Sequence, residues 1–345
     1  MSNLVPTRPG EVGRWVQTDA ASAYPDLSSL TYGLQAALGL AGGLQVLERR
    51  PTVRPHTFSS EVVTCRLTEG EELTLFCKYE GLAAHPAHGH RGGIAYEANV
   101  YRHVLGASSS DTPRFYGSYM NGGTGETWLV IESIDGYRRV LETTAPERPG
   151  GRPRVGAMPL AAAWVGRFHA EQGATDHGVG GGHLTVYDGA YYRGWALRTA
   201  RFAADWPASR PWIRPLCRRG IEAMTELESG PLTVVHGEFY PGNVLFRGGV
   251  VYPVDWESAA VAPGEIDLAA LIERWPAEIA RRCIRAYRAA RWPRGTPRDF
   301  GRRLSVARLY LHFRWLGDRR DWVTQTRFSW RYEGLRALGE QLGLI

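Results

Sequence analysis

Residues 232–257 read LTVVHGEFYPGNVLFRGGVVYPVDWE, and they carry the most specific pattern in the chain. The stretch contains three apolar runs rich in β-branched residues, which are Leu232–Val235, Val244–Phe246 and Val250–Val254. A polar loop separates the first two runs, and the turn Arg247-Gly248-Gly249 separates the last two. Short β-branched runs bounded by Gly, Pro and Asn are typical of strands, so we expect a strand, a loop and a hairpin here.

Three polar side chains, Glu238, Asn243 and Asp255, stand at the ends of these apolar segments. Such positions place a side chain at the rim of a rigid sheet, where it faces a cleft. Two carboxylates and an amide have a shared chemical use. Phosphoryl transfer needs a carboxylate that orients the attacking hydroxyl, and it needs oxygen ligands that hold magnesium against the phosphates of a nucleotide. The pattern therefore indicates a site for phosphoryl transfer.

The stretch resembles the catalytic and metal loops of the aminoglycoside phosphotransferase family, the small-molecule branch of the protein-kinase-like fold. That family carries His-Gly-Asp, four further residues, Asn and a later metal-binding Asp. This chain matches at His236, Gly237, Asn243 and Asp255 with the same spacing. It departs at the catalytic acid, which is Glu238 here. The resemblance covers roughly residues 58–275 and implies an α+β, bilobal fold, with an antiparallel sheet and helices in the N-lobe and a mostly helical C-lobe.

The resemblance also implies roles for these residues. Asn243 and Asp255 would hold Mg²⁺, while Glu238 would align the acceptor hydroxyl with the γ-phosphorus, with His236 and Asn243 in the catalytic group. Glu257 is close enough in sequence to join the metal ligands. Glu in place of Asp adds one methylene, and a misplacement of about 1 Å lowers a rate by as much as ~100-fold unless the loop is built around Glu.

Lys78 is the only lysine among the 41 Lys and Arg residues of the chain. A lone lysine in an arginine-rich chain points to a position where a broad, planar guanidinium will not serve, such as an ammonium that reaches one phosphate from a strand. Residues 62–67 and 73–79 read as a hairpin, and Lys78 lies in its second strand. Glu97, in the first turns of a helix expected over 94–105, has the order and spacing of the glutamate that steers such a lysine.

The resemblance extends to two weaker signals. The apolar strand that begins at Thr127 ends in polar residues and looks like a hinge, where backbone groups around Glu132 to Ile134 would meet adenine. The nucleotide loop, residues 57–61, lacks the glycine repeat of protein kinases, and Ser59 and Ser60 are the candidates there for capping phosphates. The expected organisation is an N-lobe over 1–127, a hinge over 128–137 and a C-lobe over 138–345.

Composition excludes several other classes of protein. Of the 345 residues, 43% are hydrophobic and 22% are charged, as in ordinary soluble proteins. No apolar run is long enough to span a membrane and no basic segment with an apolar core resembles a signal peptide, so we expect a cytoplasmic protein. The net charge of +6 fits an anionic cofactor such as ATP, with GTP as the alternative, and it fits an acidic substrate equally well. The basic and aromatic interleaving of a nucleic-acid surface is missing.

The cysteines and the histidine-rich segment predict neither a disulfide nor a metal site. The cysteines form no CxxC pair, so a reduced chain with Cys65 and Cys77 as two buried thiols is favoured over a cross-strand pair. His85, His88 and His90 invite a zinc hypothesis, but the segment 85–93 is rich in glycine and has no neighbouring Cys or carboxylate. We interpret that segment as a solvated connection.

The C-terminal helices, expected over about 277–290, 298–317 and 320–342, build the acceptor pocket in the family. They are rich in Arg and Trp, unlike the acidic pocket expected for a polycationic aminoglycoside, although a solvated arginine face over an aromatic core is the favoured interpretation. The acceptor is expected to be the hydroxyl of a small molecule, such as a natural product or antibiotic. The chain itself is expected to be a monomer or homodimer.

Three functional hypotheses remain open at this point. The favoured one is a working small-molecule kinase in which Glu238 replaces Asp. The second is a weak or inactive nucleotide-binding scaffold. The third is a kinase-like enzyme that acts on a peptide, or a reused site with different chemistry such as elimination. Intact Lys78, Asn243 and Asp255 argue against a decayed site, because a scaffold has no need of both metal ligands.

Overall fold

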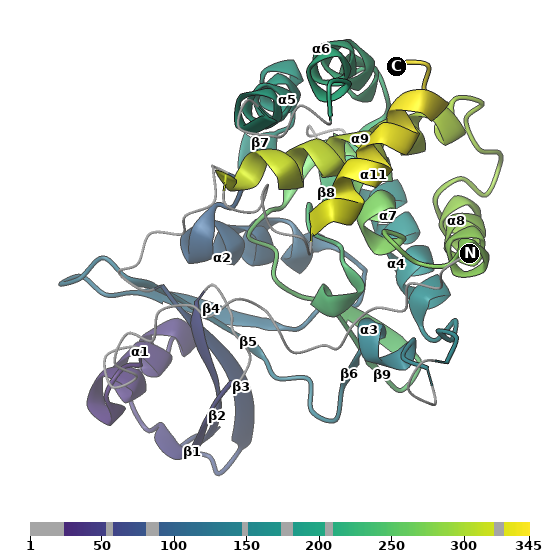
Figure 1. Ribbon diagram of the computed structural model, residues 1–345. Coiled ribbons are helices and arrows are strands. Elements are labelled where there is room, and N and C mark those ends of the chain that lie inside the picture. The colour runs from purple at the N-terminus through teal and green to yellow at the C-terminus, as the bar shows by residue number, and fades with distance from the viewer. Residues whose placement is uncertain are drawn as a thin grey trace.

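The computed structural model describes residues 24–52, 58–80, 90–146, 151–173, 182–203, 210–320 and 328–345. Figure 1 shows a part built from one helix and a sheet, joined to a larger part that is mostly helical. The strands of the main sheet are β1 (Gln45–Pro51), β2 (Ser59–Arg66), β3 (Glu72–Tyr79), β4 (Phe115–Met120) and β5 (Thr127–Glu132). They are antiparallel, in the order β1-β2-β3-β5-β4.

Alternation along β3 gives the sheet two different faces. Leu75, Cys77 and Tyr79 point into a small core that α1 (Leu27–Leu38) covers. Phe76 and Lys78 point to the other face, toward α2 (Gly93–His103) and the larger core of the helical part. The same-face prediction for Lys78 and Phe76 is confirmed, because side chains of a strand alternate with period two.

Helix α1 begins and ends where its sequence indicates. The side chain of Asp26 accepts a hydrogen bond from the backbone N–H of Ser29, which satisfies one of the free donors of the first turn. Gly39 closes the helix in the left-handed conformation, with φ of 69°, that glycine adopts without cost. The helix therefore ends at Leu38.

The helical part is built from antiparallel and crossing helices around one core. Its members are α3 (Val140–Thr143), α4 (Met158–Gln172), α5 (Gly189–Phe202), α6 (Ile213–Met224), α7 (Glu265–Leu271), α8 (Ala277–Arg291), α9 (Phe300–Asp318) and α11 (Ser329–Gln341). Helix α9 lies at the centre of this part, and most of its side chains are buried (Figure 1). The helix expected over 320–342 corresponds to α11, which begins at Ser329 and ends at Gln341. Residues 321–327 lie outside the described chain.

Two small sheets carry the stretch from which the sequence argument began. Strand β8 (Leu232–Val235) pairs with β11 (Ala260–Pro263), which also pairs with β7 (Thr185–Val186). Strands β9 (Val244–Arg247) and β10 (Val250–Pro253) form the expected hairpin, and β6 (Arg138–Arg139) pairs with β9. The predicted strand, loop and hairpin are confirmed.

Three further expectations can be compared with the structure. The cysteines are all free and buried, as expected for thiols that act as small apolar side chains. No helix in the described ranges is long and apolar enough to cross a bilayer. Strand β1 extends to Pro51 because it pairs along β2 as far as Glu61.

Gly117 of β4 makes the contact between α1 and the sheet possible. A Cβ atom built at Gly117 would lie 1.9 Å from the carbonyl oxygen of Ala37, in the last turn of α1. We expect Gly117→Ala to push α1 off the sheet and to lower the free energy of unfolding by about 1–3 kcal/mol, as overpacking does. Urea denaturation measures this change.

Gly122→Ala is the matched control, because a Cβ atom at Gly122 has no neighbour within 4 Å. That variant should unfold within about 0.5 kcal/mol of the parent protein. Equal stability of Gly117→Ala and Gly122→Ala would show that α1 does not pack on Gly117 as described.

Candidate active site

Lys78 joins the sheet to the helical part through two carboxylates. Its Nζ donates to Oε2 of Glu97 at 2.7 Å and to Oδ1 of Asp255 at 2.6 Å. Burial lowers the pKa of Lys78, but the negative charges of Asp255 and Glu97 outweigh burial and hold it above its ordinary value. Burial raises the pKa of Asp255, and the Lys78 ammonium reverses this and holds it well below its usual range. The ammonium and the Asp255 carboxylate are therefore charged at neutral pH.

Glu97 is buried and uses both of its oxygens. Its Oε1 accepts a hydrogen bond from the backbone N–H of Trp256 at 3.0 Å, while Oε2 binds Lys78. The expected pairing of Lys78 with Glu97 is present, and the same glutamate also fixes the backbone next to Asp255. The ring of Phe58 lies 5.3 Å from Lys78 Nζ, close enough for a cation–π contact.

Asp267, on α7, supports the loop that follows β8 from beneath. Its Oδ2 accepts from the backbone N–H of His236 at 2.7 Å, and its Oδ1 accepts from that of Gly237 at 2.9 Å. His169 of α4 lies 3.1 Å from the same carboxylate and 3.0 Å from the hydroxyl of Tyr287, so two helices hold the loop through one buried group. His169 and Asp267 therefore have a structural role beneath the loop.

His236 and Gly237 shape this loop without reaching its open side. His236 is fully buried; its Nε2 lies 3.0 Å from the carbonyl oxygen of Val254, and its Nδ1 lies 3.3 Å from the backbone N–H of Glu238. These contacts make His236 a positioning residue. Gly237 has φ of 80°, and a Cβ atom there would lie 2.1 Å from the carbonyl oxygen of Ser258, so only glycine fits.

Asn243, Asp255 and Glu257 offer a set of oxygen donors that suits magnesium. Asn243 Nδ2 donates to the carbonyl oxygen of Glu238 at 3.0 Å, which fixes the amide and leaves its Oδ1 as the acceptor. The Asp255 side chain is 34% exposed, and Asp255 has a positive φ of 73°. Glu257 Oε2 is buried and has no hydrogen-bond partner among the described residues. Hard oxygen ligands with room for waters are what Mg²⁺ requires.

Burial, reinforced by the nearby Asp255 charge, raises the pKa of Glu257 to about 8. The positive charges of Lys78 and Arg91 oppose this rise, but burial and the neighbouring carboxylates outweigh them. No group of three or more His, Cys, Asp or Glu side chains in the described ranges could hold a metal ion. The zinc hypothesis for the histidine segment thus has no support there, and His85 and His88 lie outside the described residues.

Glu238 lies in a position that its sequence context did not predict. Its side chain is only 3% exposed, and two arginines bind it. Arg91 donates from Nε to Oε2 and from Nη2 to Oε1, both at 3.1 Å, and Arg314 Nη2 donates to Oε1 at 3.2 Å. Arg91 also lies 3.1 Å from Glu257 Oε1, so it bridges the two glutamates. We call Arg91 and Arg314 the arginine clamp.

The interpretation of residues 85–93 as a solvated connection is wrong for its last members. His90 is buried, and its Nδ1 lies 2.9 Å from the hydroxyl of Tyr191 on α5. Gly92 donates its backbone N–H to the carbonyl oxygen of Glu257 at 2.7 Å, which docks the segment on the loop after β10. This tertiary contact has no local signature in a stretch rich in His and Gly.

The solvated arginine face that the sequence favoured is present only in part, since Arg302 and Arg320 are exposed while other C-terminal arginines are buried. Arg303 of α9 is buried against Glu265, Arg331 of α11 is buried against Glu273, and Arg314 is buried against Glu238. Arg308 on α9 is exposed. Each buried guanidinium faces a carboxylate, as expected because an unpaired buried charge is costly.

The residues predicted to meet the nucleotide lie on two strands: Ser59 and Ser60 belong to β2, and Glu132 and Ile134 lie at and just after the end of β5. Ser60 pairs with Lys78 across β2 and β3, but its hydroxyl is buried and lies 2.7 Å from that of Thr52, whereas Ser59 is half-buried. Strand β5 ends at Glu132, whose carboxylate accepts from the backbone N–H of Arg114 at 3.1 Å, and Ile134 is buried. The structure thus brings Lys78, Glu97 and Asp255 together and places Asn243 beside Glu238.

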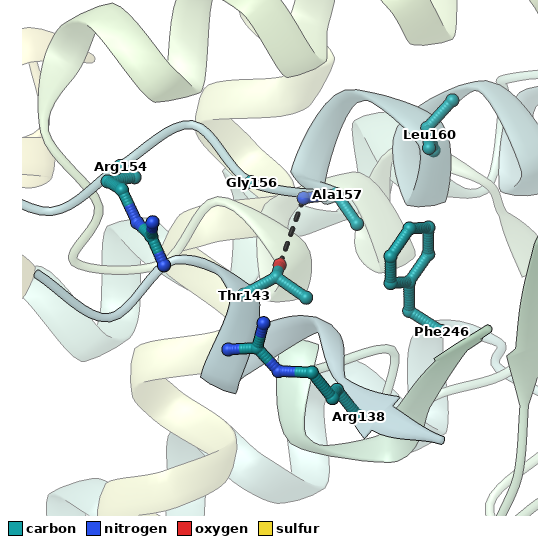
Figure 2. Close-up of a pocket in the computed structure, with 7 residues that line it drawn as sticks. All are labelled: Arg138, Thr143, Arg154, Gly156, Ala157, Leu160 and Phe246. Atoms are coloured by element: carbon teal, nitrogen blue, oxygen red, sulfur yellow. Dashed lines mark hydrogen bonds between the residues drawn. The ribbon is translucent and has the colours of Figure 1, made fainter. Parts of the chain in front are cut away.

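A separate surface pocket of about 300 Å³ lies where α3, α4 and β9 meet (Figure 2). Arg138 and Phe246 line it, and the hydroxyl of Thr143 accepts from the backbone N–H of Ala157 at 2.9 Å. None of the predicted site residues lines this pocket. It is distinct from the site around Lys78 and Glu238.

Solved structures with the same fold include several kinases. The GDP complex of aminoglycoside 2'-phosphotransferase-IIIa has a TM-score of 0.58 at 13% identity, covering 92% of this chain and 99% of that one. A choline/ethanolamine kinase family protein from Mesorhizobium loti has a TM-score of 0.56 at 18% identity, covering 92% and 96%. The macrolide 2'-phosphotransferase MphH from Brachybacterium faecium has a TM-score of 0.51 at 19% identity, covering 91% and 97%.

These likenesses establish an α+β, protein-kinase-like fold, as the sequence predicted. None of the curated proteins is detectably similar in sequence. The model of the phosphotransferase enzyme family (APH) matches residues 60–300, which is more than half of the chain and includes every residue of the network around Lys78. The chain therefore belongs to the phosphotransferase enzyme family.

Proposed function

We propose that this protein transfers the γ-phosphate of ATP, with GTP as the alternative donor, to a hydroxyl group of a small molecule. The observation that carries the proposal is the contact network in which Lys78 binds both Glu97 and Asp255 while Asn243 holds the backbone of Glu238. These residues come from a strand, a helix and two loops. Three of the four charged groups are buried, an arrangement that is costly unless it serves a purpose beyond stability.

The roles follow from the charges and the exposure of each group. Lys78 would bind phosphate oxygens of the nucleotide through its ammonium. Because Lys78, Glu97 and Asp255 together carry a net negative charge, the phosphates would approach with Mg²⁺, which offsets the charge of Asp255. Asn243 and Asp255, with Glu257 as a third candidate, would hold Mg²⁺, which neutralises phosphate charge when bound. Asp255 is the more exposed of the two partners of Lys78, so it is the one from which the ammonium can turn away.

Glu238 would orient the acceptor hydroxyl, which comes from a natural product or antibiotic. The likeness to kinases that act on aminoglycosides, macrolides and choline supports a small-molecule acceptor rather than a peptide. The hinge around Glu132 and Ile134 and the half-buried Ser59 are proposed to meet the nucleotide, and Ser60 would do so through its backbone. We propose a cytoplasmic protein that acts as a monomer or homodimer.

A second candidate function rests on the arginine clamp. Because both oxygens of Glu238 are bound, a protein that never released them would bind nucleotide without transferring phosphate, as a scaffold. The two functions share a nucleotide site and differ in whether product forms, so the first prediction below tests both and the second separates them.

The nucleotide site predicts a magnesium-dependent gain in stability. With ATP or GTP at about 100 times its dissociation constant, binding should add ~2.7 kcal/mol and raise the melting temperature by several degrees. Asp255→Asn should abolish the part of this gain that needs magnesium, because the amide lacks the charge that Mg²⁺ requires. Thermal melting with each nucleotide, with and without magnesium, measures both effects.

Asp111→Asn is the control, since Asp111 is exposed and distant in sequence from the site residues. It should respond to nucleotide and magnesium as the parent protein does. A melting temperature that neither nucleotide changes in the parent protein would contradict the proposed function in both of its forms.

Glu238→Gln should lower the turnover number by about 10²–10⁴, the usual contribution of a positioned acid or base, while nucleotide affinity changes little. Glu238→Asp should also lose about 100-fold, since it withdraws the carboxylate by about 1 Å from a loop that is built around Glu. Release of nucleoside diphosphate, measured across a panel of hydroxylated acceptors, tests both variants. Undiminished turnover of Glu238→Gln would remove Glu238 from the mechanism, and absence of turnover in the parent protein would favour the scaffold.

A further inference from the structure

We infer that the acceptor carries an anionic group, a carboxylate or a phosphate, which takes the place of Glu238 in the arginine clamp and so frees Glu238 for the reaction. The inference rests on the proposed phosphotransferase function and specifies its substrate class. It concerns Arg91 and Arg314, which no part of the phosphate-transfer chemistry above requires.

The first observation is that Glu238 is inaccessible as it stands. Its side chain is 3% exposed, Arg91 holds both of its oxygens, and Arg314 holds Oε1 as well. An acceptor hydroxyl must come within about 3.2 Å of a carboxylate oxygen to be oriented by it. Glu238 must therefore leave at least part of the clamp before any acceptor can use it.

The second observation is that the clamp cannot be left without an anion. Arg314 is only 2% exposed, and its Nε has no hydrogen-bond partner among the described residues. Beyond Glu238, its close polar contact is the hydroxyl of Tyr240 at 2.9 Å, which carries no charge at neutral pH because burial raises the pKa of that hydroxyl. A buried guanidinium that loses its carboxylate pays a large desolvation cost.

The two arginines differ in what remains when Glu238 moves. Arg91 keeps Glu257, whose Oε1 lies 3.1 Å from its Nε. Arg314 keeps only the weaker attraction of Asp318, four residues further along α9. A neutral acceptor would leave Arg314 unmatched, and a cationic acceptor would be repelled by both arginines. An acceptor with a carboxylate or phosphate group would replace the lost charge, and Arg314 would be its main partner.

Aromatic side chains hold Arg314 in its orientation. Arg314 lies over the ring of Trp315, 4.7 Å from its centroid, and the indole N–H of Trp315 donates to the Tyr240 hydroxyl at 2.7 Å. The guanidinium of Arg314 is thereby fixed in orientation, so it can select an anion by geometry as well as by charge.

In the transfer step, one bond to the γ-phosphorus forms and another breaks. The acceptor oxygen forms a bond to the γ-phosphorus while the bond from that phosphorus to the bridging oxygen breaks, and the nucleoside diphosphate leaves. The proton of the acceptor hydroxyl passes to the freed Glu238 carboxylate and from there to water. No oxidant, reductant or further reactant takes part.

The test compares matched acceptors in the full-length protein. Gluconate is paired with glucose and glycerol 3-phosphate with glycerol, and glucosamine represents the cations. Isothermal titration is carried out with the nucleotide site filled by magnesium and a non-hydrolysable nucleotide, and turnover is followed with ATP and GTP. We expect at least one acid to bind, and to accept phosphate, at least about 10-fold better than its neutral partner.

Arg314→Gln should raise KM for that acid about 10- to 100-fold, more than it changes the turnover number, and should abolish the preference for the acid over its neutral partner. Arg314→Lys should restore part of the loss, since it keeps the charge but not the fork. Arg308→Gln, an exposed arginine on the same helix, is the control and should behave as the parent protein does.

Three results would overturn the inference. One is equal binding of acids and their neutral partners, and another is a preference for glucosamine. The third is that magnesium and nucleotide bind normally but no anion tested, inorganic phosphate included, depends on Arg314. Each anion would then either bind equally well to Arg314→Gln or not bind at all. Loss of nucleotide binding itself would instead contradict the proposed function, so the two failures are distinguishable.

Discussion

The rest of the site depends on one buried ammonium that satisfies two carboxylates from different parts of the molecule. Lys78 belongs to the sheet, Glu97 to α2 and Asp255 to the loop after β10. Removing one partner of such a pair leaves a buried charge, at a cost of about 3–5 kcal/mol, so the three elements are held in register by charge as well as by packing. Glu97 adds a second link between α2 and the loop after β10, because it also binds the backbone N–H of Trp256, next to Asp255.

The framework of the site could be predicted because its signals are local. The strand, loop and hairpin of residues 232–257 follow from apolar runs and turn residues, and the single lysine indicates a site by its rarity. His236 and Asn243 lie at fixed spacing within one loop.

The arginine clamp could not be predicted for the opposite reason. Arg91 and Arg314 lie 147 and 76 residues from Glu238 in the chain, and nothing in their local sequence distinguishes them from the other arginines. Only the packing of α9 and the docking of Gly92 on Glu257 bring them together. The one local hint is the Glu at position 238 itself, because a longer acid reaches partners that Asp would not.

The scarcity of lysine has a practical consequence for covalent chemistry. Reagents that acylate or crosslink amines will find a single side chain in this protein, and that side chain is 7% exposed and held by two carboxylates. Its protonated state resists acylation, because only the neutral amine is nucleophilic. Labelling of Lys78 therefore reports directly on how often its ion pairs open, and an amine-reactive nucleotide analogue would mark one residue of known position.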